Sequence, residues 1–128
     1  MTPTSAGQPS PAEYAERAAE AVRGLNHATI RPGGYVWPSD VNDVVRELQR
    51  AATGMGQALE QARTWLARAH ARGLVGHDQA ADVDAAVWDA GNALSDAARG
   101  ARWLGEDLAR ATAITTHLTG TRYGEDDR

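Results

Sequence analysis

The stretch 70–78, HARGLVGHD, concentrates the side chains of this sequence that are best suited to chemistry. His70, His77 and Asp78 could together bind a metal ion through imidazole nitrogens and a carboxylate. Their spacing matches no recurrent ligand motif, and no fourth ligand is obvious nearby. The same residues suit a bend, in which Gly73 ends one helix in the left-handed conformation and His77 or Asp78 caps the next. We therefore interpret this stretch as a turn.

The other histidines offer a weaker alternative. An antiparallel helical hairpin would bring His117 close to Asp43 and far from His70, so a cluster of His27, His117 and Asp43 is geometrically conceivable. Histidines on a solvated surface are the more common case. The sequence contains no cysteine, which excludes thiolate zinc sites and cysteine nucleophiles. It also has no E-x-x-H pair, G-x-S-x-G elbow or glycine-rich phosphate loop. We predict no catalytic residue, metal or cofactor, and keep a histidine metalloenzyme as a minor alternative.

The elements that must position these side chains are helices. Apolar residues recur with alternating spacings of four and three, which is a heptad pattern. In the first long stretch the pattern comprises Val41, Val45, Leu48, Ala52, Met55, Leu59, Ala62, Leu66 and Ala69. It resumes with Val83, Val87, Ala90, Leu94, Ala97, Ala101, Leu104, Leu108, Ala111, Thr115 and Leu118. Two long helices joined by a short turn form an antiparallel hairpin.

The segment SPAE at 10–13 marks the start of a shorter helix, with Ser10 as the cap and Pro11 at the first helical position. We thus predict an all-α fold with a single domain over 10–120, a three-helix bundle resembling a coiled coil. Its parts are helix 11–27, an aromatic loop 28–39, helix 40–72, turn 73–78 and helix 79–119, between a disordered tail 1–9 and an acidic tail 121–128.

Composition predicts a thin core. The sequence has 26 Ala but only 19 Leu, Ile and Val together, and no Phe. A core of methyl groups buries little apolar surface per residue. We therefore expect a second copy to complete the bundle as a homodimer.

Several aromatic residues lie outside the heptad pattern. Trp88 and Trp103 are off the stripe of their helix, and Trp65 extends the apolar flank of its own. The first helix or the aromatic loop would cover them in a self-contained domain, whereas tryptophans left exposed would indicate a binding surface. The candidate interface or ligand surface is Tyr35, Trp37, Trp65, Trp88 and Trp103.

Charge and hydropathy limit the partners. The net charge is −4 and all 13 basic residues are arginines dispersed among acids, so the chain lacks the basic stripe of a nucleic-acid-binding protein. No run of 18 apolar residues and no signal-peptide pattern is present, so we expect no membrane association and a soluble cytoplasmic protein.

The segments WPSDV (37–41), WLARAH (65–70) and GHD (76–78), followed by an Ala-rich stretch, resemble a group of small helical proteins of unknown function encoded by actinomycetes. The resemblance extends over residues 35–120 and implies a cytoplasmic bacterial accessory protein without enzymatic activity. The turn lacks the Trp-x-Gly of the WXG100 secreted proteins, which argues against that family.

These observations favour a non-enzymatic module for protein–protein interaction. The alternative from a different class is a helical bundle that binds a small molecule in an apolar pocket lined by Trp and Ala.

Overall fold

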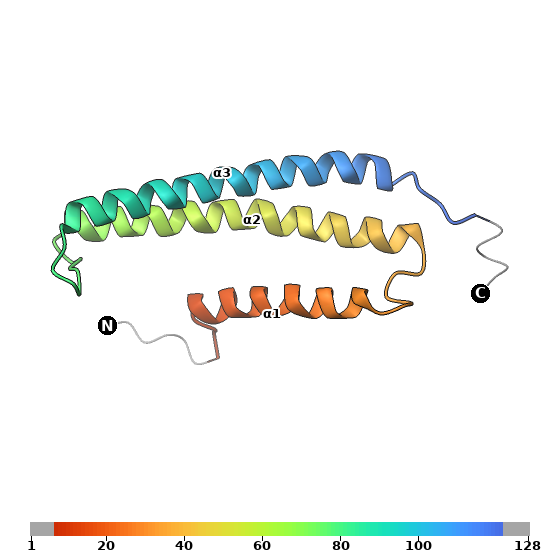
Figure 1. Cartoon of the computed structure of the whole chain (residues 1–128), viewed down its shortest axis with the longest axis horizontal. Coiled ribbons are helices and arrows are strands. Elements are labelled where there is room, and N and C mark those ends of the chain that lie inside the picture. Colours follow the sequence, from red (N-terminus) through yellow and green to blue (C-terminus); the bar gives the residue numbers. More distant parts are fainter. Residues whose placement is uncertain (1–6, 122–128) are drawn as a thin grey trace. The chain divides into compact units, whose positions relative to one another are not determined.

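The computed structural model describes residues 7–121, and all regular secondary structure in that range is helical. Helix α1 spans Pro11–Ile30, α2 spans Pro38–Ala71 and α3 spans Val83–Thr115 (Figure 1). The predicted all-α fold class is confirmed. The chain divides into two compact units, one ending at Val36 and the other beginning at Trp37, and each is described by itself. The predicted tails lie largely outside the described residues.

Helix α1 begins where the sequence indicates. The Ser10 hydroxyl accepts a hydrogen bond from the Glu13 backbone N–H at 3.2 Å, and Pro11 occupies the first turn. The helix continues past the predicted end at residue 27 to Ile30. It stops there because Pro32 restricts the residue before it, and Arg31 accordingly has an extended backbone.

Helix α2 begins slightly earlier than predicted, at Pro38 instead of residue 40. Trp37 is its N-cap residue: its backbone N–H donates to the Asp40 carboxylate at 2.8 Å, and the Asp40 N–H donates to the Trp37 carbonyl at 2.9 Å. Pro38 suits the first helical position because its missing N–H would have no partner there. Asp40 therefore stabilises the helix start from inside the first turn.

The turn at Gly73 is confirmed. Helix α2 ends at Ala71, and Gly73 adopts a left-handed backbone with a φ of 74°. The N–H of Gly73 donates to the carbonyl of His70 at 2.9 Å, and the N–H of Leu74 donates to that of Ala69 at 3.0 Å. This pair of bonds is a Schellman motif, which satisfies the last carbonyls of the helix.

The predicted cap at His77 or Asp78 is wrong. Helix α3 starts at Val83 instead of residue 79, and the Asp82 carboxylate caps it by accepting from the Ala85 N–H at 3.2 Å. Ala80 has a positive φ of 55°, a conformation that interrupts a right-handed helix. The helix also ends earlier than predicted, at Thr115 instead of residue 119.

Helices α2 and α3 pack side by side as the predicted antiparallel hairpin (Figure 1). They approach each other closely at small residues: a Cβ placed on Gly56 would lie 3.6 Å from the Ala98 carbonyl oxygen and 3.8 Å from the Ala101 Cβ. A Cβ on Gly105 would lie 3.6 Å from the Thr53 hydroxyl. The two backbones come together because no large side chain separates them here.

Because the helices meet at these glycines, the line of contact between α2 and α3 differs from the predicted heptad stripe. Met55 and Leu104, both predicted to lie in the seam, are 50% and 48% exposed, while the adjacent Gly56 and Gly105 are buried. Neighbouring helical residues are rotated by about 100°, so turning the glycines inward turns the two larger side chains outward.

The core is as thin as the composition predicts. Among the described residues, the buried apolar side chains are Ala52, Ala69, Ala98 and Ala101, and no large side chain is fully buried. Each buried methyl group contributes only about 0.8 kcal/mol, so the hairpin gains little stability from its own interior.

We expect Ala98→Leu to destabilise the hairpin, because Ala98 has no exposed surface and faces the backbone of α2 near Gly56. Overpacking of this kind costs about 1–3 kcal/mol. Urea denaturation followed by circular dichroism measures the change. Ala113→Leu on the exposed side of α3 is the matched control and should change stability by less than about 0.5 kcal/mol. Equal stability of the two variants would contradict the close approach.

Candidate interaction surface

The α2–α3 hairpin has two different sides. On one side, polar residues of the two helices contact each other: the Thr115 hydroxyl donates to the Asn42 side-chain oxygen at 2.7 Å, and His70 Nε2 lies 2.7 Å from an Asp84 carboxylate oxygen. The Thr112 hydroxyl lies 3.4 Å from the Gln49 side-chain oxygen. These contacts link α2 to α3 near both ends of the hairpin. We call this side the polar face.

The opposite side carries almost only apolar and small residues, and we call it the apolar face. Residues three and four apart share one side of a helix, which defines its members. On α2 they are Val41, Val44, Leu48, Ala51, Met55, Ala58, Ala62 and Trp65; on α3 they are Val83, Ala86, Ala90, Ala93, Ala97, Gly100, Leu104, Ala111 and Ile114. Asp107, which is paired with Arg110, is the one charged residue in these stripes.

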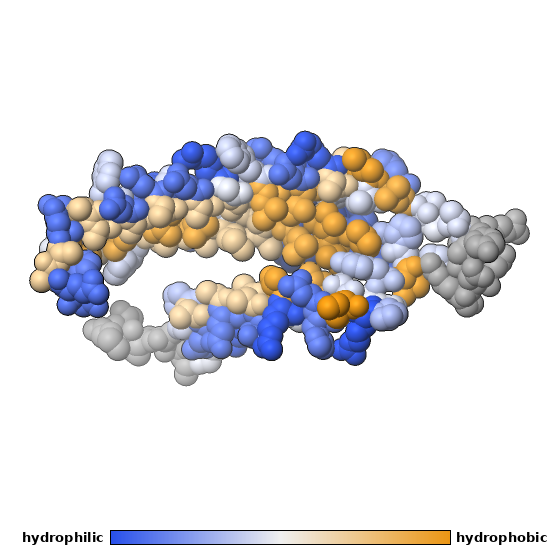
Figure 2. All heavy atoms as spheres, viewed as in Figure 1, coloured by the Kyte–Doolittle hydropathy of each residue, from blue (hydrophilic) through white to orange (hydrophobic). Residues whose placement is uncertain are grey.

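The space-filling view makes this asymmetry visible. A band of apolar surface runs along one side of the hairpin, and hydrophilic side chains line the opposite side (Figure 2). Met55, Trp65, Leu104 and Ile114 are among the large apolar side chains that stay exposed on the apolar face. Exposed apolar surface of this kind makes the apolar face the candidate interaction surface.

The structure separates the three helical tryptophans of the predicted surface. Trp65, Trp88 and Trp103 expose 68%, 71% and 63% of their surface. Trp65 lies at the edge of the apolar face, Trp88 borders the polar face and Trp103 points outward from α3. The candidate surface predicted from tryptophans is therefore not one contiguous patch.

The remaining aromatic candidates differ from one another. Tyr35 lies before α2 and is 41% exposed. Trp37 is partly buried, and its ring lies so close to Gly120 that a Cβ there would be 2.7 Å from two ring carbons. Trp37 thus covers the chain that follows α3, in the unit that contains the hairpin. Its role is to close one end of the hairpin.

The histidines do not form a joint site. His70 contacts Asp84, whereas His77 lies 3.7 Å from Asp78 and accepts a hydrogen bond from the Gln79 N–H at 3.0 Å through Nδ1. Within residues 7–121, no group of three histidine, aspartate or glutamate side chains is close enough to hold a metal ion. The alternative cluster combines His27 of the first unit with His117 and Asp43 of the second, so it stays a prediction.

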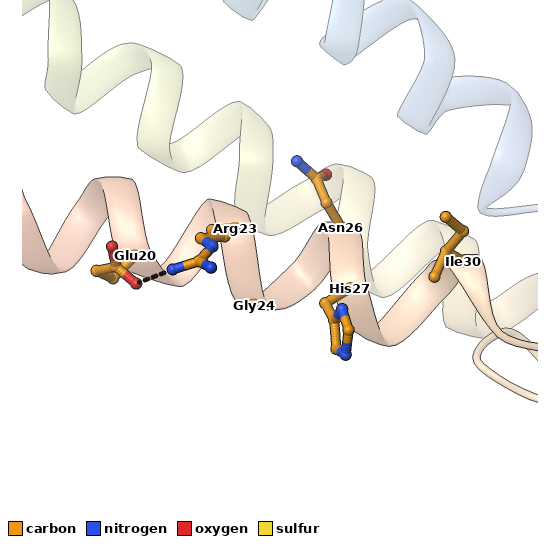
Figure 3. A pocket seen from close by; sticks show the side chains of 6 residues that line it. All are labelled: Glu20, Arg23, Gly24, Asn26, His27 and Ile30. Carbon is orange, nitrogen blue, oxygen red and sulfur yellow. Dashed lines mark ion pairs between the residues drawn. The ribbon is translucent and has the colours of Figure 1, made fainter.

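A surface hollow on α1 contains His27 but lacks the features of a site. Its lining residues all come from α1, and Glu20 pairs with Arg23 at 3.6 Å (Figure 3). Asn26 and Ile30 project to one side of the helix and His27 to the other (Figure 3). A hollow formed by one helix alone does not bring side chains together around a ligand.

Several residues that define the two faces were missed by the sequence pattern. Asn42 is the only buried polar residue in the described range, and Gly56 and Gly105 replace Met55 and Leu104 at the helix contact. The available signal was a column of polar and small residues, next to the heptad stripe, that runs from Asn42 through Gln49 and Gly56 to Arg63 and His70. Its regular spacing of seven marks it as a flank of the seam.

Comparison with protein-family models, with curated proteins and with solved structures finds no match for this chain. The resemblance to actinomycete helical proteins therefore stays a hypothesis. In the described part of the chain, none of the helices combines the length and hydropathy needed to cross a bilayer.

We expect Trp37 to be the tryptophan most shielded from solvent, because its ring packs against Gly120. In variants that keep one tryptophan each, with the others changed to Phe, acrylamide should quench Trp37 less than Trp88. Adding Gly120→Val should raise the quenching of Trp37 and leave Trp88 unchanged. Equal quenching of Trp37 and Trp88 would show that the contact does not form in solution.

Proposed function

We propose that this protein is a non-enzymatic interaction module, which buries the apolar face of its α2–α3 hairpin against a helical surface of a protein partner. The observation that carries the proposal is the one-sidedness of the hairpin. Polar side chains satisfy each other across the polar face, as in Thr115 with Asn42, while large side chains such as Met55 and Leu104 remain exposed on the other face.

The spacing of the apolar face supports a helical partner. Its residues repeat with the alternating four and three spacing of a coiled-coil stripe, along α2 as well as α3. A helix laid along two such stripes would meet apolar side chains at every turn. Extended peptides and nucleic acids would leave most of this surface without a complementary contact.

Support for a non-enzymatic role comes from the state of the polar side chains. The pairs Glu47–Arg50, Glu60–Arg63 and Asp96–Arg99 are ordinary ion pairs between residues three apart on one helix. Such pairs stabilise helix surfaces by a few tenths of a kcal/mol and need no chemical role.

We expect the double substitution Met55→Glu and Leu104→Glu to abolish partner binding. Each substituted side chain would be buried in the complex as an unpaired carboxylate, which costs several kcal/mol. In affinity capture from cells that encode the protein, the variant should lose specifically bound proteins at least about tenfold, equivalent to 1.4 kcal/mol. Because Met55 and Leu104 are half exposed, helicity measured by circular dichroism should persist.

The matched control is Gln57→Glu with Ala109→Glu, which adds the same charge at exposed positions bordering the polar face. This control should retain the proteins captured by the wild type. The proposal is wrong if both double variants capture the same proteins in the same amounts as the wild type.

A second candidate function, small-molecule binding, is favoured by a groove on the polar face. The groove has a volume of about 530 Å³ and lies between α2 and α3. Leu66, Val87 and Trp88 supply its apolar surface, and His70 with Asp84 supplies polar groups at one end. Its volume is within the range of small-ligand sites.

If this groove binds apolar anions, the dye 8-anilinonaphthalene-1-sulfonate should gain fluorescence with the wild-type protein. Trp88→Ala should weaken that binding several-fold, because an aromatic side chain buries about 150–250 Å² in a contact. Trp103→Ala, which removes an equally exposed tryptophan outside the groove, should leave binding unchanged. Equal effects of the two substitutions would exclude the groove as the binding site.

A further inference from the structure

We infer that the surface covering the apolar face is a second copy of the chain, packed face to face with its turn at the opposite end, to form a four-helix bundle. This inference rests on the proposed function and names its partner. Three features of the hairpin support it: the size of the face, the distribution of large and small residues along it, and the weakness of the core.

The face is large enough for a stable dimer. Helix α2 has 34 residues, which at about 1.5 Å per residue is about 50 Å of length. Two packed helices are roughly 20 Å wide, so the face covers roughly 1,000 Å². A standard specific interface buries about 800 Å² on each partner. A single helix of 20 residues, the length of α1, would cover only roughly a third of the face.

Large and small residues separate along the face. The open end of the hairpin, where α2 begins and α3 ends, carries Val41, Val44, Leu48, Leu104 and Ile114. The half next to the turn carries mainly alanines, namely Ala58, Ala62, Ala86, Ala90, Ala93 and Ala97. The exceptions in this half are Trp65, at the outer edge of the face, and Val83, at its tip.

If the second copy is antiparallel, the end of the face with large side chains lies against the end with alanines. A twofold axis near Met55, at the middle of α2, sets α2 against α2 of the partner with Leu48 opposite Ala62. On α3 the same operation sets Leu104 opposite Ala97. Leu48 and Leu104 then meet alanines on either side of the axis, as large and small residues do in tightly packed cores, while Met55 meets Met55 at the axis.

A parallel pair of hairpins lacks this fit. It would place the open ends together, with Val41 of one copy near Ile114 of the other, and would place alanines against alanines at the turn ends. The two faces would then be held apart at one end and leave gaps at the other, with the loss of contact that cavities entail. The size gradient therefore selects the antiparallel arrangement.

The weakness of the core gives association its driving force. Among the described residues, the interior of one hairpin fully buries only small side chains, and Met55, Leu104 and Ile114 stay 50%, 48% and 66% exposed. Fully burying a Leu, Val or Met side chain contributes about 1.5–3 kcal/mol. A dimer interface that covers Met55, Leu104 and Ile114 in two copies thus adds a second, larger core.

Light scattering coupled to size-exclusion chromatography tests the assembly. At micromolar concentration the wild type should have twice the 13.6 kDa chain mass. Met55→Glu with Leu104→Glu should reduce the mass to one chain, because the two introduced carboxylates at position 55 would also face each other near the axis. Gln57→Glu with Ala109→Glu should remain a dimer.

Cysteine crosslinking tests the orientation in a chain that is otherwise wild type. Because the sequence has no cysteine, single introduced thiols report single contacts. Met55→Cys should form a disulfide with its own copy, and a mixture of Leu48→Cys and Ala62→Cys should form the mixed disulfide. Leu48→Cys alone and Gln57→Cys, which is outside the face, should not crosslink.

A wild-type monomer would overturn the inference, as would a dimer that survives the Met55 and Leu104 double substitution. A disulfide between Met55→Cys and Gly100→Cys in mixtures, without self-crosslinking of Met55→Cys, would indicate the parallel dimer and overturn the orientation. If the wild type is a monomer and the face variant still loses captured proteins, the proposed function stands with a different protein as the occupant. If neither dimer nor captured protein depends on the face, both proposals fail.

Discussion

The close approach of α2 and α3 at Gly56, Ala98 and Ala101 determines the rest of the hairpin. Where two backbones come this near, only glycine and alanine fit between them, and the helices must rotate until those residues face inward. That rotation carries Met55 and Leu104 out of the contact. The small core and the exposed apolar face therefore have the same cause. A hairpin with larger residues at the contact would keep its leucines inside and have no such face.

Polar pairs fix which way the helices rotate. Asn42 is buried and its side-chain oxygen accepts from the Thr115 hydroxyl, and at the other end His70 meets Asp84. A rotation that buried the apolar face instead would separate these pairs and leave Asn42 without its partner, at a cost of about 1–3 kcal/mol. A single buried polar residue in a coiled-coil seam acts similarly by fixing register. The glycine and alanine contact and these polar pairs thus stabilise the same rotation of the helices, the one that leaves the apolar face exposed.

The sequence predicts the helices well because their ends depend on local chemistry. Ser10 and Gly73 act within a few residues of themselves, so the start of α1 and the end of α2 can be predicted. The start of α3 is harder to predict, because Asp78 and Asp82 are both suitable caps and the positive φ of Ala80, which excludes the earlier start, has no sequence signal. Whether Met55 or Gly56 faces α3 is harder still to predict, since both fit a heptad stripe. It depends on how near the partner helix comes, which is a property of the packed pair.

The three helical tryptophans do not lie on one face of the hairpin, and tryptophan identity alone does not define a binding surface. A tryptophan contributes strongly to binding only where neighbouring contacts exclude water around it. Trp65 borders a stripe that continues through Ala62 and Ala58, but it is itself 68% exposed. Trp103 points away from both helical stripes, and Trp88 lies beside the charged and polar groups of His70 and Asp84. The apolar face is defined by many modest side chains in regular spacing, and its extent follows from the helix contact.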